Sequence, residues 1–383
     1  MEPVNIAIEG QGDNLPPLLL RPPGPADVTA VAELFNDPQT SQWSLVPKPF
    51  TEAHAKTFLE IARRDWNRDS PRWLICDADG SKVLGTVALR RHPRQTWEVV
   101  FHTAPWARRR QVALRAVHAA VRFGFATLSA RRLEWNAIVG NHLSRLIAIR
   151  LGFQLEGVAR AMADQRGTRV DQWIGSLLPG ELRELDDPPP DYDVDRKRAL
   201  LFCGGQPSLD TAVEGLRLRP LHADDIELIV EACQDPETAR WTTVPQPYER
   251  QHAEYFVDQV GAGSWRQGIA VIFALADAED RFCGGIDLRL NSADKRVGEV
   301  GFSSAPWSRG RGYMTAALRA VCDFGFDSLD LERVEWKAFV GNVASRRVAE
   351  KAGFTMEGTL RSDVLARGER VDSWVAALLR GDR

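Results

Sequence analysis

Hydrophobic positions in the second half of the chain follow two alternating spacings, one typical of strands and one typical of helices. Short apolar or alternating runs predict strands at 216–218, 270–276, 285–290, 299–303, 334–339, 354–361 and 371–379. Apolar residues at helical spacing predict helices at 223–233, 312–324 and 343–352. This order of elements predicts an α/β domain whose central sheet is mixed, mostly antiparallel and flanked by helices.

The first half repeats this pattern because the chain contains two copies of one sequence. At a constant offset of 201 residues, 98–178 and 299–379 are identical at 37 of 81 positions without a gap, which chance does not produce. One matched piece is Ala104-Pro105-Trp106 with Ala305-Pro306-Trp307. Each copy has roughly 170 residues, far more than a solenoid repeat. The chain is therefore predicted to fold as two tandem domains, 1–180 and 214–383.

The segment 181–213 between the copies is predicted to be a linker. It contains three consecutive prolines, Pro188-Pro189-Pro190, and a glycine pair, Gly204-Gly205. Proline lacks the amide that helices and sheet centres need, and glycine loses more backbone entropy on folding than other residues. This composition argues against a helix or a central strand that continues from either copy.

Composition narrows the class of protein without naming it. The chain has 383 residues, is 44% hydrophobic and 26% charged, and carries a formal net charge of −3, so it is folded and shows no basic excess for nucleic acid. It has no apolar run long enough to cross a bilayer and no signal-peptide pattern at its start, so we expect a cytoplasmic protein without a membrane partner. Its five cysteines form no CxxC pair, and we expect no metal site.

A loop with two glycines follows the predicted strand 299–303. It reads Arg309-Gly310-Arg311-Gly312-Tyr313 and leads directly into a predicted helix. Glycine lets the backbone turn its N–H groups toward an anion that approaches closely, and a helix N-terminus adds unpaired donors and the positive end of its dipole. The loop predicts a phosphate cradle; the alternative is a plain turn followed by a helix cap.

The sequence from 216 to 379 resembles the GCN5-related N-acetyltransferases (GNAT), and within them the ribosomal-protein alanine N-acetyltransferase branch. The motifs that carry the resemblance are Arg309-Gly310-Arg311-Gly312, Gly341-Asn342-Val343-Ala344-Ser345-Arg346, Gly353-Phe354 and Glu357-Gly358. Residues 18–178 resemble the same family more weakly. The family usually has Gln or Arg three positions before Gly310, where this sequence has Trp307.

The resemblance implies acetyl-CoA as co-substrate. The amides implied to hold its diphosphate belong to Gly310, Arg311, Gly312 and Tyr313, with Arg309 at the start of the loop. The pantetheine arm is implied to pair with the preceding strand through Phe302 and Ser303. The implied chemistry is direct transfer of an acyl group to an amine within a ternary complex.

Three residues are candidates for catalysis. An amine is mostly protonated near neutral pH, so a base must take a proton before attack, and Glu299 is the candidate, directly or through a water. The alternative for Glu299 is a surface ion pair. The resemblance implies Ser345 as hydrogen-bond donor to the leaving thiolate and Asn342 as holder of the pantetheine or acyl carbonyl. The alternative for both is helix capping, because they fall at the N-cap and N3 positions of one predicted helix.

The acceptor is expected to be a primary amine on a protein N-terminus, a lysine or a small molecule. Candidate contacts to it are Trp241, Tyr248, His252 and Asp363. Two other functions stay open: a non-catalytic CoA-binding sensor or scaffold, and transfer of a bulkier acyl group.

The first copy lacks the glycines of the loop. It reads Arg108-Arg109-Arg110-Gln111-Val112 where the second copy has Arg309 to Tyr313, so side chains occupy the places that a diphosphate would approach. We expect one active half and one structural half. Because single-copy relatives commonly pair as homodimers, two covalently joined copies predict a pseudo-dimeric monomer.

Overall fold

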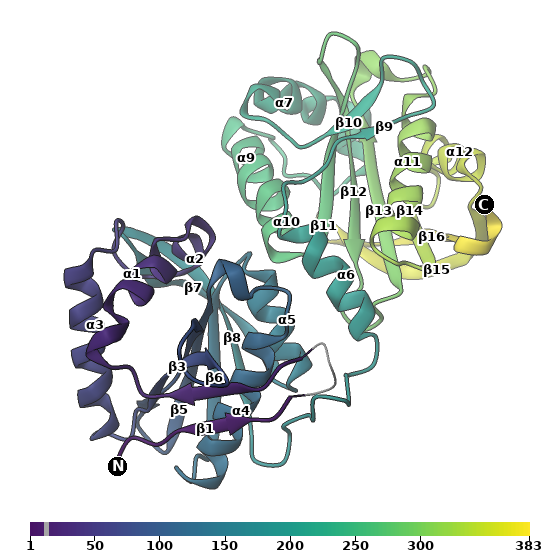
Figure 1. The fold of residues 1–383 in the computed structure, drawn as a ribbon. Coiled ribbons are helices and arrows are strands. Elements are labelled where there is room, and N and C mark those ends of the chain that lie inside the picture. The colour runs from purple at the N-terminus through teal and green to yellow at the C-terminus, as the bar shows by residue number, and fades with distance from the viewer. Residues whose placement is uncertain (11–14) are drawn as a thin grey trace. The chain divides into compact units, whose positions relative to one another are not determined.

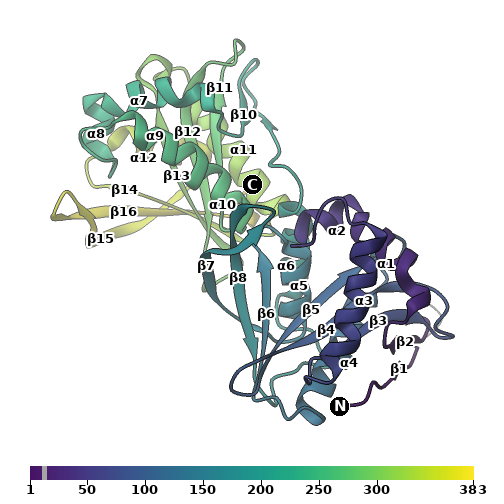
Figure 2. The same ribbon diagram turned by 90° about the vertical axis from the view of Figure 1, so that its left-hand side faces the viewer.

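The computed structural model describes residues 1–10 and 15–383. The chain divides into two compact units, Met1–Tyr192 and Asp193–Arg383. Each unit contains one eight-stranded sheet with helices on its faces (Figures 1 and 2). The predicted α/β class, with two tandem domains of one architecture, is confirmed.

The first unit has the strand order β1-β2-β3-β4-β5-β6-β8-β7. Its strands are β1 (Ile6–Ile8), β2 (Leu18–Arg21), β3 (Arg72–Asp77), β4 (Val83–His92), β5 (Thr96–Thr103), β6 (Arg132–Ile138), β7 (Gln154–Gln165) and β8 (Thr168–Leu177). Its helices are α1 (Val28–Asn36), α2 (Pro38–Trp43), α3 (Glu52–Trp66), α4 (Val112–Ala126) and α5 (His142–Arg150). The sheet is antiparallel except for the pair β5–β6.

The second unit has the order β15-β16-β14-β13-β12-β11-β10-β9, again with one parallel pair, β13–β14. Its strands are β9 (Leu209–Asp210), β10 (Arg217–Arg219), β11 (Ala270–Ala276), β12 (Phe282–Leu290), β13 (Val297–Ser304), β14 (Arg333–Phe339), β15 (Thr355–Ala366) and β16 (Glu369–Leu379). Its helices are α6 (Tyr192–Phe202), α7 (Ile226–Gln234), α8 (Pro236–Trp241), α9 (Arg250–Tyr255), α10 (Gly263–Gln267), α11 (Tyr313–Ser328) and α12 (Val343–Ala352), with a π-helical segment at Phe256–Ala262.

Apolar packing holds the second sheet between two groups of helices. Figure 1 shows α7, α9 and α10 on one side of its strands and α11 and α12 on the other. Helix α11 buries Ala317, Val321 and Phe324, the residues whose spacing predicted it, against a core that includes the fully buried Trp336 of β14. Burial of such side chains contributes about 1.5–3 kcal/mol each for the large ones.

The segment 181–213 contains more structure than the expected linker. Helix α6 follows its prolines, and β9 pairs with β10 at the edge of the second sheet. Phe202 of α6 packs edge-on against Trp265, with ring centroids 4.7 Å apart. Composition missed this helix because its stabilising contacts come from residues far away in the sequence.

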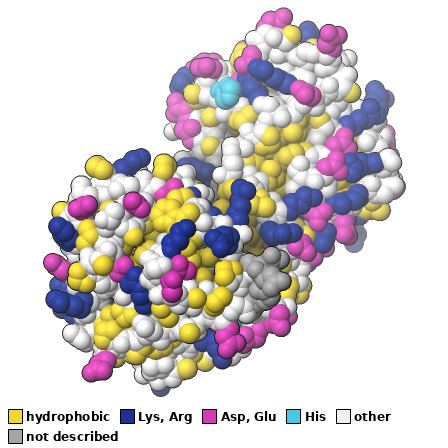
Figure 3. Space-filling view, in the orientation of Figure 1, with side chains coloured by type: hydrophobic (Ala, Val, Ile, Leu, Met, Phe, Trp, Pro, Cys, Tyr) yellow, Lys and Arg dark blue, Asp and Glu magenta, His cyan; other side chains and the backbone are white. Residues whose placement is uncertain are grey.

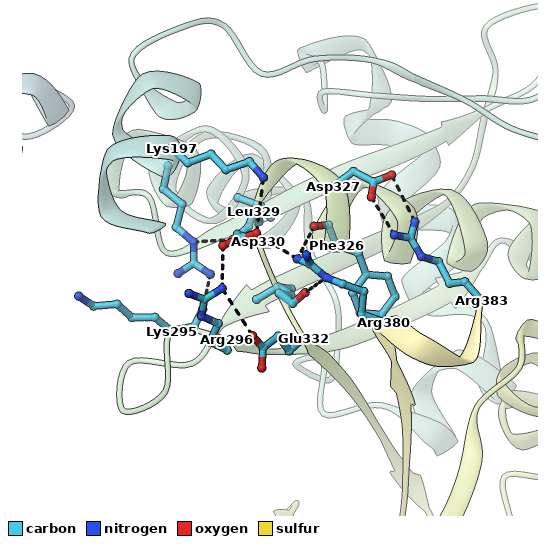
Figure 4. A network of polar contacts seen from close by, with 12 residues as sticks. Lys197, Lys295, Arg296, Phe326, Asp327, Leu329, Asp330, Glu332, Arg380 and Arg383 are labelled. Atoms are coloured by element: carbon cyan, nitrogen blue, oxygen red, sulfur yellow. Dashed lines mark hydrogen bonds and ion pairs between the residues drawn. The ribbon is translucent and has the colours of Figure 1, made fainter. Parts of the chain in front are cut away.

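Charged residues fasten α6 to its unit, as Figure 4 shows. The carboxylate of Asp330 lies at the centre of the network. The nitrogen–oxygen distances to it are 3.6 Å from Lys197 of α6, 2.7 Å from Arg296 and 3.1 Å from Arg380. Lys295 pairs with Asp195 of the same helix at 2.7 Å. Because one carboxylate is shared by three cations, this network joins the helix, the start of β13 and the end of the chain.

The surface matches the near-neutral composition. On the face in Figure 3, acidic and basic side chains are interspersed rather than gathered by sign. Among the helices of the described residues, none is both long enough and apolar enough to span a bilayer. The five cysteines are free thiols, of which Cys76, Cys283 and Cys322 are buried.

An ion pair between an arginine and an aspartate lies near the start of each unit, and in the second unit it is buried. In the second unit the guanidinium of Arg219 donates two hydrogen bonds of 2.8 Å to Asp225, and both side chains are almost completely buried. Asp225 also accepts a hydrogen bond of 2.8 Å from the backbone N–H of His222. In the first unit Arg21 and Asp27 form the same pair at 2.7 and 2.9 Å.

Asp225→Ala should destabilise the second unit by about 3–5 kcal/mol, because it leaves the buried guanidinium of Arg219 without this partner. Denaturant unfolding followed by tryptophan fluorescence measures the effect. The matched control is Asp224→Ala at the exposed neighbouring residue, for which we expect a change within about 0.5 kcal/mol. Equal effects of the two substitutions would contradict the assignment of stability to the pair.

Candidate active site

The second sheet opens between its two parallel strands. β13 and β14 are in register from Val297–Arg333 to Val300–Trp336. Beyond that point β13 continues beside β12 to Ser304, whereas β14 continues beside β16 to Phe339. The two strands therefore part, and backbone groups on the facing edges of 301–304 and 337–339 become free to pair with a ligand.

A cavity of about 640 Å³ lies at this opening. Phe302 and Ser303 of β13 line it on one side, and Lys337 and Phe339 of β14 line it on the other. Helix α7, the segment between α8 and α9 and the start of the π-helical segment add an apolar wall that includes Ile229, Cys233, Val244, Tyr248 and Phe256. The cavity thus joins a strand edge suited to an extended ligand with a partly apolar chamber.

The glycine loop has the geometry of an anion cradle. Gly310 and Gly312 have φ angles of +76° and +77°, which disfavour other residues, and a Cβ placed on either one would meet nothing within 4 Å. The space above the loop is therefore open, and packing does not require glycine there. Helix α11 begins at Tyr313 without a side-chain cap, so its first N–H groups remain available to an anion.

The side chains of Arg309 and Trp307 connect the glycine loop to other parts of the second unit. Nη2 of Arg309 contacts Asp235 Oδ2 at 2.5 Å and Thr238 Oγ1 at 3.0 Å, which ties the loop to the start of α8. Nε1 of Trp307 donates to the carbonyl of Phe282 at 2.9 Å. The side chains of both residues are engaged by the protein, so these contacts give them a structural role in shaping the loop.

Glu299 lies in the cavity between two cations. Its Oε1 is 2.6 Å from Arg289 Nη2, and its Oε2 is 3.5 Å from Lys337 Nζ. About a third of the side chain is exposed. The ion pair that formed the alternative interpretation of Glu299 is present, but it faces the cavity rather than the outer surface.

Asn342 and Ser345 form the cap of α12. The carboxamide Oδ1 of Asn342 accepts the N–H of Ser345 at 3.1 Å, and Trp336 Nε1 donates to Ser345 Oγ at 3.2 Å. These bonds leave the amide hydrogens of Asn342 and the hydroxyl hydrogen of Ser345 free to be donated, and both residues line the cavity. The capping contacts of the alternative interpretation are thus observed, and they leave these hydrogens unused.

The four candidate acceptor residues separate into two groups. Trp241, Tyr248 and Asp363 line the cavity, and Asp363 accepts a hydrogen bond of 2.6 Å from Ser373. His252 does not line it; its Nδ1 accepts the N–H of Glu249 at 3.0 Å in a capping box at the start of α9. His252 is therefore placed as part of a helix end.

Asp287 is a cavity residue that the sequence analysis missed. It lies on β12 opposite Gly301 of β13, and its carboxylate is 3.1 Å from Arg289 Nη1. Burial is the main cause that raises the pKa of Asp287 to about 6; Arg289 opposes this rise and Glu299 adds to it. The sequence signal that could have indicated Asp287 is an acidic residue within a predicted strand, because strands that are buried on both faces rarely contain an acid.

The first half keeps the fold and has larger side chains at several positions of the site. Its loop residues Arg109 and Gln111 have φ angles of +60° and +54°, so the same loop conformation persists without glycine. At the positions of Gly301 and Ser303 the first half has Val100 and His102, and Phe35 packs edge-on against His102 at 5.0 Å between ring centroids. Side chains occupy space that the second half leaves open.

Comparison with known proteins identifies the family. The model of the acetyltransferase (GNAT) domain matches residues 17–154 and 215–355, so the chain belongs to this family in both halves. The resemblance inferred from the sequence is confirmed, and the chain is by family an acyl-CoA-dependent N-acetyltransferase.

Individual relatives match one half of the chain. The N-acetyltransferase p20 of Bacillus licheniformis is 25% identical over 168 residues, which are 44% of this chain and 94% of p20. The L-amino acid N-acetyltransferase AaaT of Escherichia coli (strain K12) is 26% identical over 164 residues, 43% of this chain and 97% of AaaT. A crystal structure of ribosomal-protein-S5-alanine acetyltransferase from Vibrio fischeri is similar with a TM-score of 0.42 and 19% identity, covering 46% of this chain and 98% of that one.

Asn342→Ala should lower the stability of the second unit by about 1 kcal/mol, because it removes the side-chain oxygen that caps α12. Asn342→Asp should restore most of this loss, since a carboxylate also accepts the N–H of Ser345. Chemical denaturation measures both effects. Asn141→Ala is the matched control, because Asn141 caps α5 in the same way in the first unit, where Ser144 donates its N–H to it at 3.3 Å. A loss confined to Asn342 would contradict a capping role shared by both halves.

Proposed function

We propose that the second half transfers an acetyl group from acetyl-CoA to a primary amine by direct attack, with both substrates bound together, and that the first half supports the fold. The observation that carries this proposal is the difference between the halves. The parallel strands part in both halves, but the second half adds an open glycine loop and a lined cavity, whereas Arg109, Gln111, Val100 and His102 take the corresponding positions in the first half.

The residues present fit the acetyl-CoA that the family implies. The amides of Gly310, Arg311, Gly312 and Tyr313 would hold the diphosphate, because their approach is free of Cβ atoms at both glycines. The free edge of β13 at Phe302 and Ser303 would pair with the pantetheine arm, and the unused amide hydrogens of Asn342 would bind one of its carbonyls. Acetyl-CoA supplies the thioester carbonyl that the amine attacks.

Two side chains of the cavity would handle protons. An α-amine has a pKa of about 8 and a lysine amine one of about 10, so the acceptor enters mostly as ammonium and must lose a proton. Glu299 faces the cavity and would take this proton, directly or through a water. Ser345 accepts a hydrogen bond from Trp336 and keeps its own hydroxyl hydrogen, which it would donate to the departing thiolate.

The acceptor is a primary amine that enters from the side of α8 and α9. Trp241 of α8 and Tyr248 before α9 line the cavity there, and Asp363 of β15 also lines it. The name of the relative AaaT describes acetylation of L-amino acids, so α-amines of amino acids and of peptides are the first probes, followed by lysine and small amines. Binding of CoA without release of thiol from any amine would favour a sensor, and the product mass identifies the acyl group.

The double substitution Gly310→Arg/Gly312→Gln, which copies the loop of the first half, should weaken CoA binding at least tenfold. The added side chains fill the open space above the loop, while the fold tolerates them because the first half already has this conformation at Arg109 and Gln111. Calorimetric titration of the full chain with CoA measures affinity and the number of bound molecules. Arg109→Ala is the control and should leave binding unchanged; the reverse pattern would assign cofactor binding to the first half.

Glu299→Gln should lower kcat at least tenfold with CoA affinity within about twofold, because glutamine keeps the shape but cannot accept the proton. Thiol release from acetyl-CoA with the best amine measures kcat. Glu98→Gln at the matching position of the first half is the control. Undiminished turnover in the Glu299 variant would remove this residue as the base.

A further inference from the structure

We infer that Asp287 is the residue that binds the ammonium group of the acceptor, and that the second half therefore selects compact primary amines with an apolar carbon chain. This inference rests on the proposed function for the reaction, but its own basis is the charge and packing of the cavity. The residue lies on β12, one strand away from the edge at which the acyl donor would pair.

The charges of the cavity leave one acid uncompensated. Its charged lining residues are the acids Asp287, Glu299 and Asp363 and the bases Arg289 and Lys337, so three negative charges face two positive ones and the formal sum is −1. Both bases are already engaged: Arg289 contacts Asp287 and Glu299, and Lys337 contacts Glu299. One bound ammonium group would bring the formal charge of the cavity to zero, whereas a bound anion would make it more negative.

Among the three acids, Asp287 is distinguished by a buried carboxylate oxygen that makes no hydrogen bond. Both oxygens of Glu299 are in ion pairs, and Asp363 accepts a hydrogen bond from Ser373. Oδ1 of Asp287 is buried and makes no hydrogen bond, because the guanidinium of Arg289 is close but not aligned to donate to it. An ammonium group has three donors and can align one of them with this oxygen.

Packing in the sheet reserves space for Asp287. A Cβ on Gly301 would lie 2.9 Å from Asp287 Oδ2 and 3.3 Å from Arg289 Nη1 and Nη2, so a larger residue at this position would require these side chains to shift. At the corresponding positions of the first half the sizes are reversed. The small residue is Ala88 on β4, and the larger residue opposite it is Val100 on β5. Each half thus pairs one large residue with one small residue at these positions. Only in the second half is the large residue charged.

The surroundings of Asp287 define the rest of the ligand. Ile229, Cys233, Val244 and Phe256 form the apolar wall of the chamber, and burial raises the pKa of the Cys233 thiol to about 11, so the thiol stays uncharged. Burial likewise raises the pKa of Tyr248, which is uncharged near neutrality. The charged groups that face Asp287 are therefore Arg289 of β12, Glu299 of β13, Lys337 of β14 and Asp363 of β15.

The test compares amines with alcohols of the same carbon number. The full chain, saturated with CoA, is titrated calorimetrically at pH 7.5 with n-butylamine and n-hexylamine and with n-butanol and n-hexanol. We expect the native chain to bind each amine at least tenfold more tightly than its alcohol. In Asp287→Asn the preference should fall below threefold, while affinity for CoA stays within twofold. Asp258→Asn, at an exposed acid outside the cavity, is the matched control and should keep the native preference.

A second variant tests whether misfolding, rather than loss of the carboxylate, explains a lost preference for amines. Asp287→Ala/Gly301→Val reproduces the Ala88–Val100 pair that the first sheet already accommodates, and it should also lose the preference for amines. In the native chain the amine affinity should fall as the pH is lowered from 7.5 to 5.5, because Asp287 takes up a proton with a pKa of about 6, and the affinity of Asp287→Asn should change less.

The outcomes separate the two proposals. An amine preference that persists in Asp287→Asn, or that is absent from the native chain, overturns the assignment of Asp287 whatever the turnover. Failure of the native chain to release thiol from acetyl-CoA with every amine overturns the proposed transfer reaction, while the amine–alcohol comparison still reports on Asp287.

Discussion

The opening between β13 and β14 is the constraint on which the second half depends. The two strands stay in register from Val297–Arg333 to Val300–Trp336 and then follow different antiparallel neighbours. Their separated edges leave backbone donors and acceptors unpaired within the domain, and a buried unpaired group costs free energy. The cap residues Asn342 and Ser345 line the cavity at this opening, and the loop with Gly310 follows β13 along the chain.

The two halves show that the loop conformation does not depend on glycine. Arg109 and Gln111 hold left-handed φ angles at a cost of about 1–2 kcal/mol per residue, and such strain persists only where the surroundings fix the backbone. Arg108 helps to hold the backbone of this loop in place through its contacts with Asp37 and Thr40. Arg309 makes the same contacts with Asp235 and Thr238 in the second half. The loop conformation alone therefore does not require glycine at 310 and 312, because the first half adopts positive φ angles there with Arg109 and Gln111.

Much of the fold was predictable from the sequence, because the strands and helices of the second half follow local periodicity. The strand 270–276 and the helix 343–352 match β11 and α12 residue for residue. Helix α6 was not predictable, since it is held by Asp330 and Trp265 from distant parts of the chain. Asp287 was missed for a related reason: its place in the cavity follows from its register with Gly301, and register between strands is a tertiary property.

The pair Asn342–Ser345 illustrates how one arrangement can serve both fold and chemistry. In the first half, Asn141 caps α5 and Trp135 donates to Ser144 at 3.0 Å, which repeats the contacts of the second half. A capping role alone is enough to keep these residues in a half whose loop carries Arg109 and Gln111. Their persistence therefore reflects the helix, and any chemistry in the second half depends on the hydrogens that capping leaves free and on the space beside them. The two halves therefore share one frame, and they differ in the side chains around it, such as Arg109 and Gln111 in place of Gly310 and Gly312.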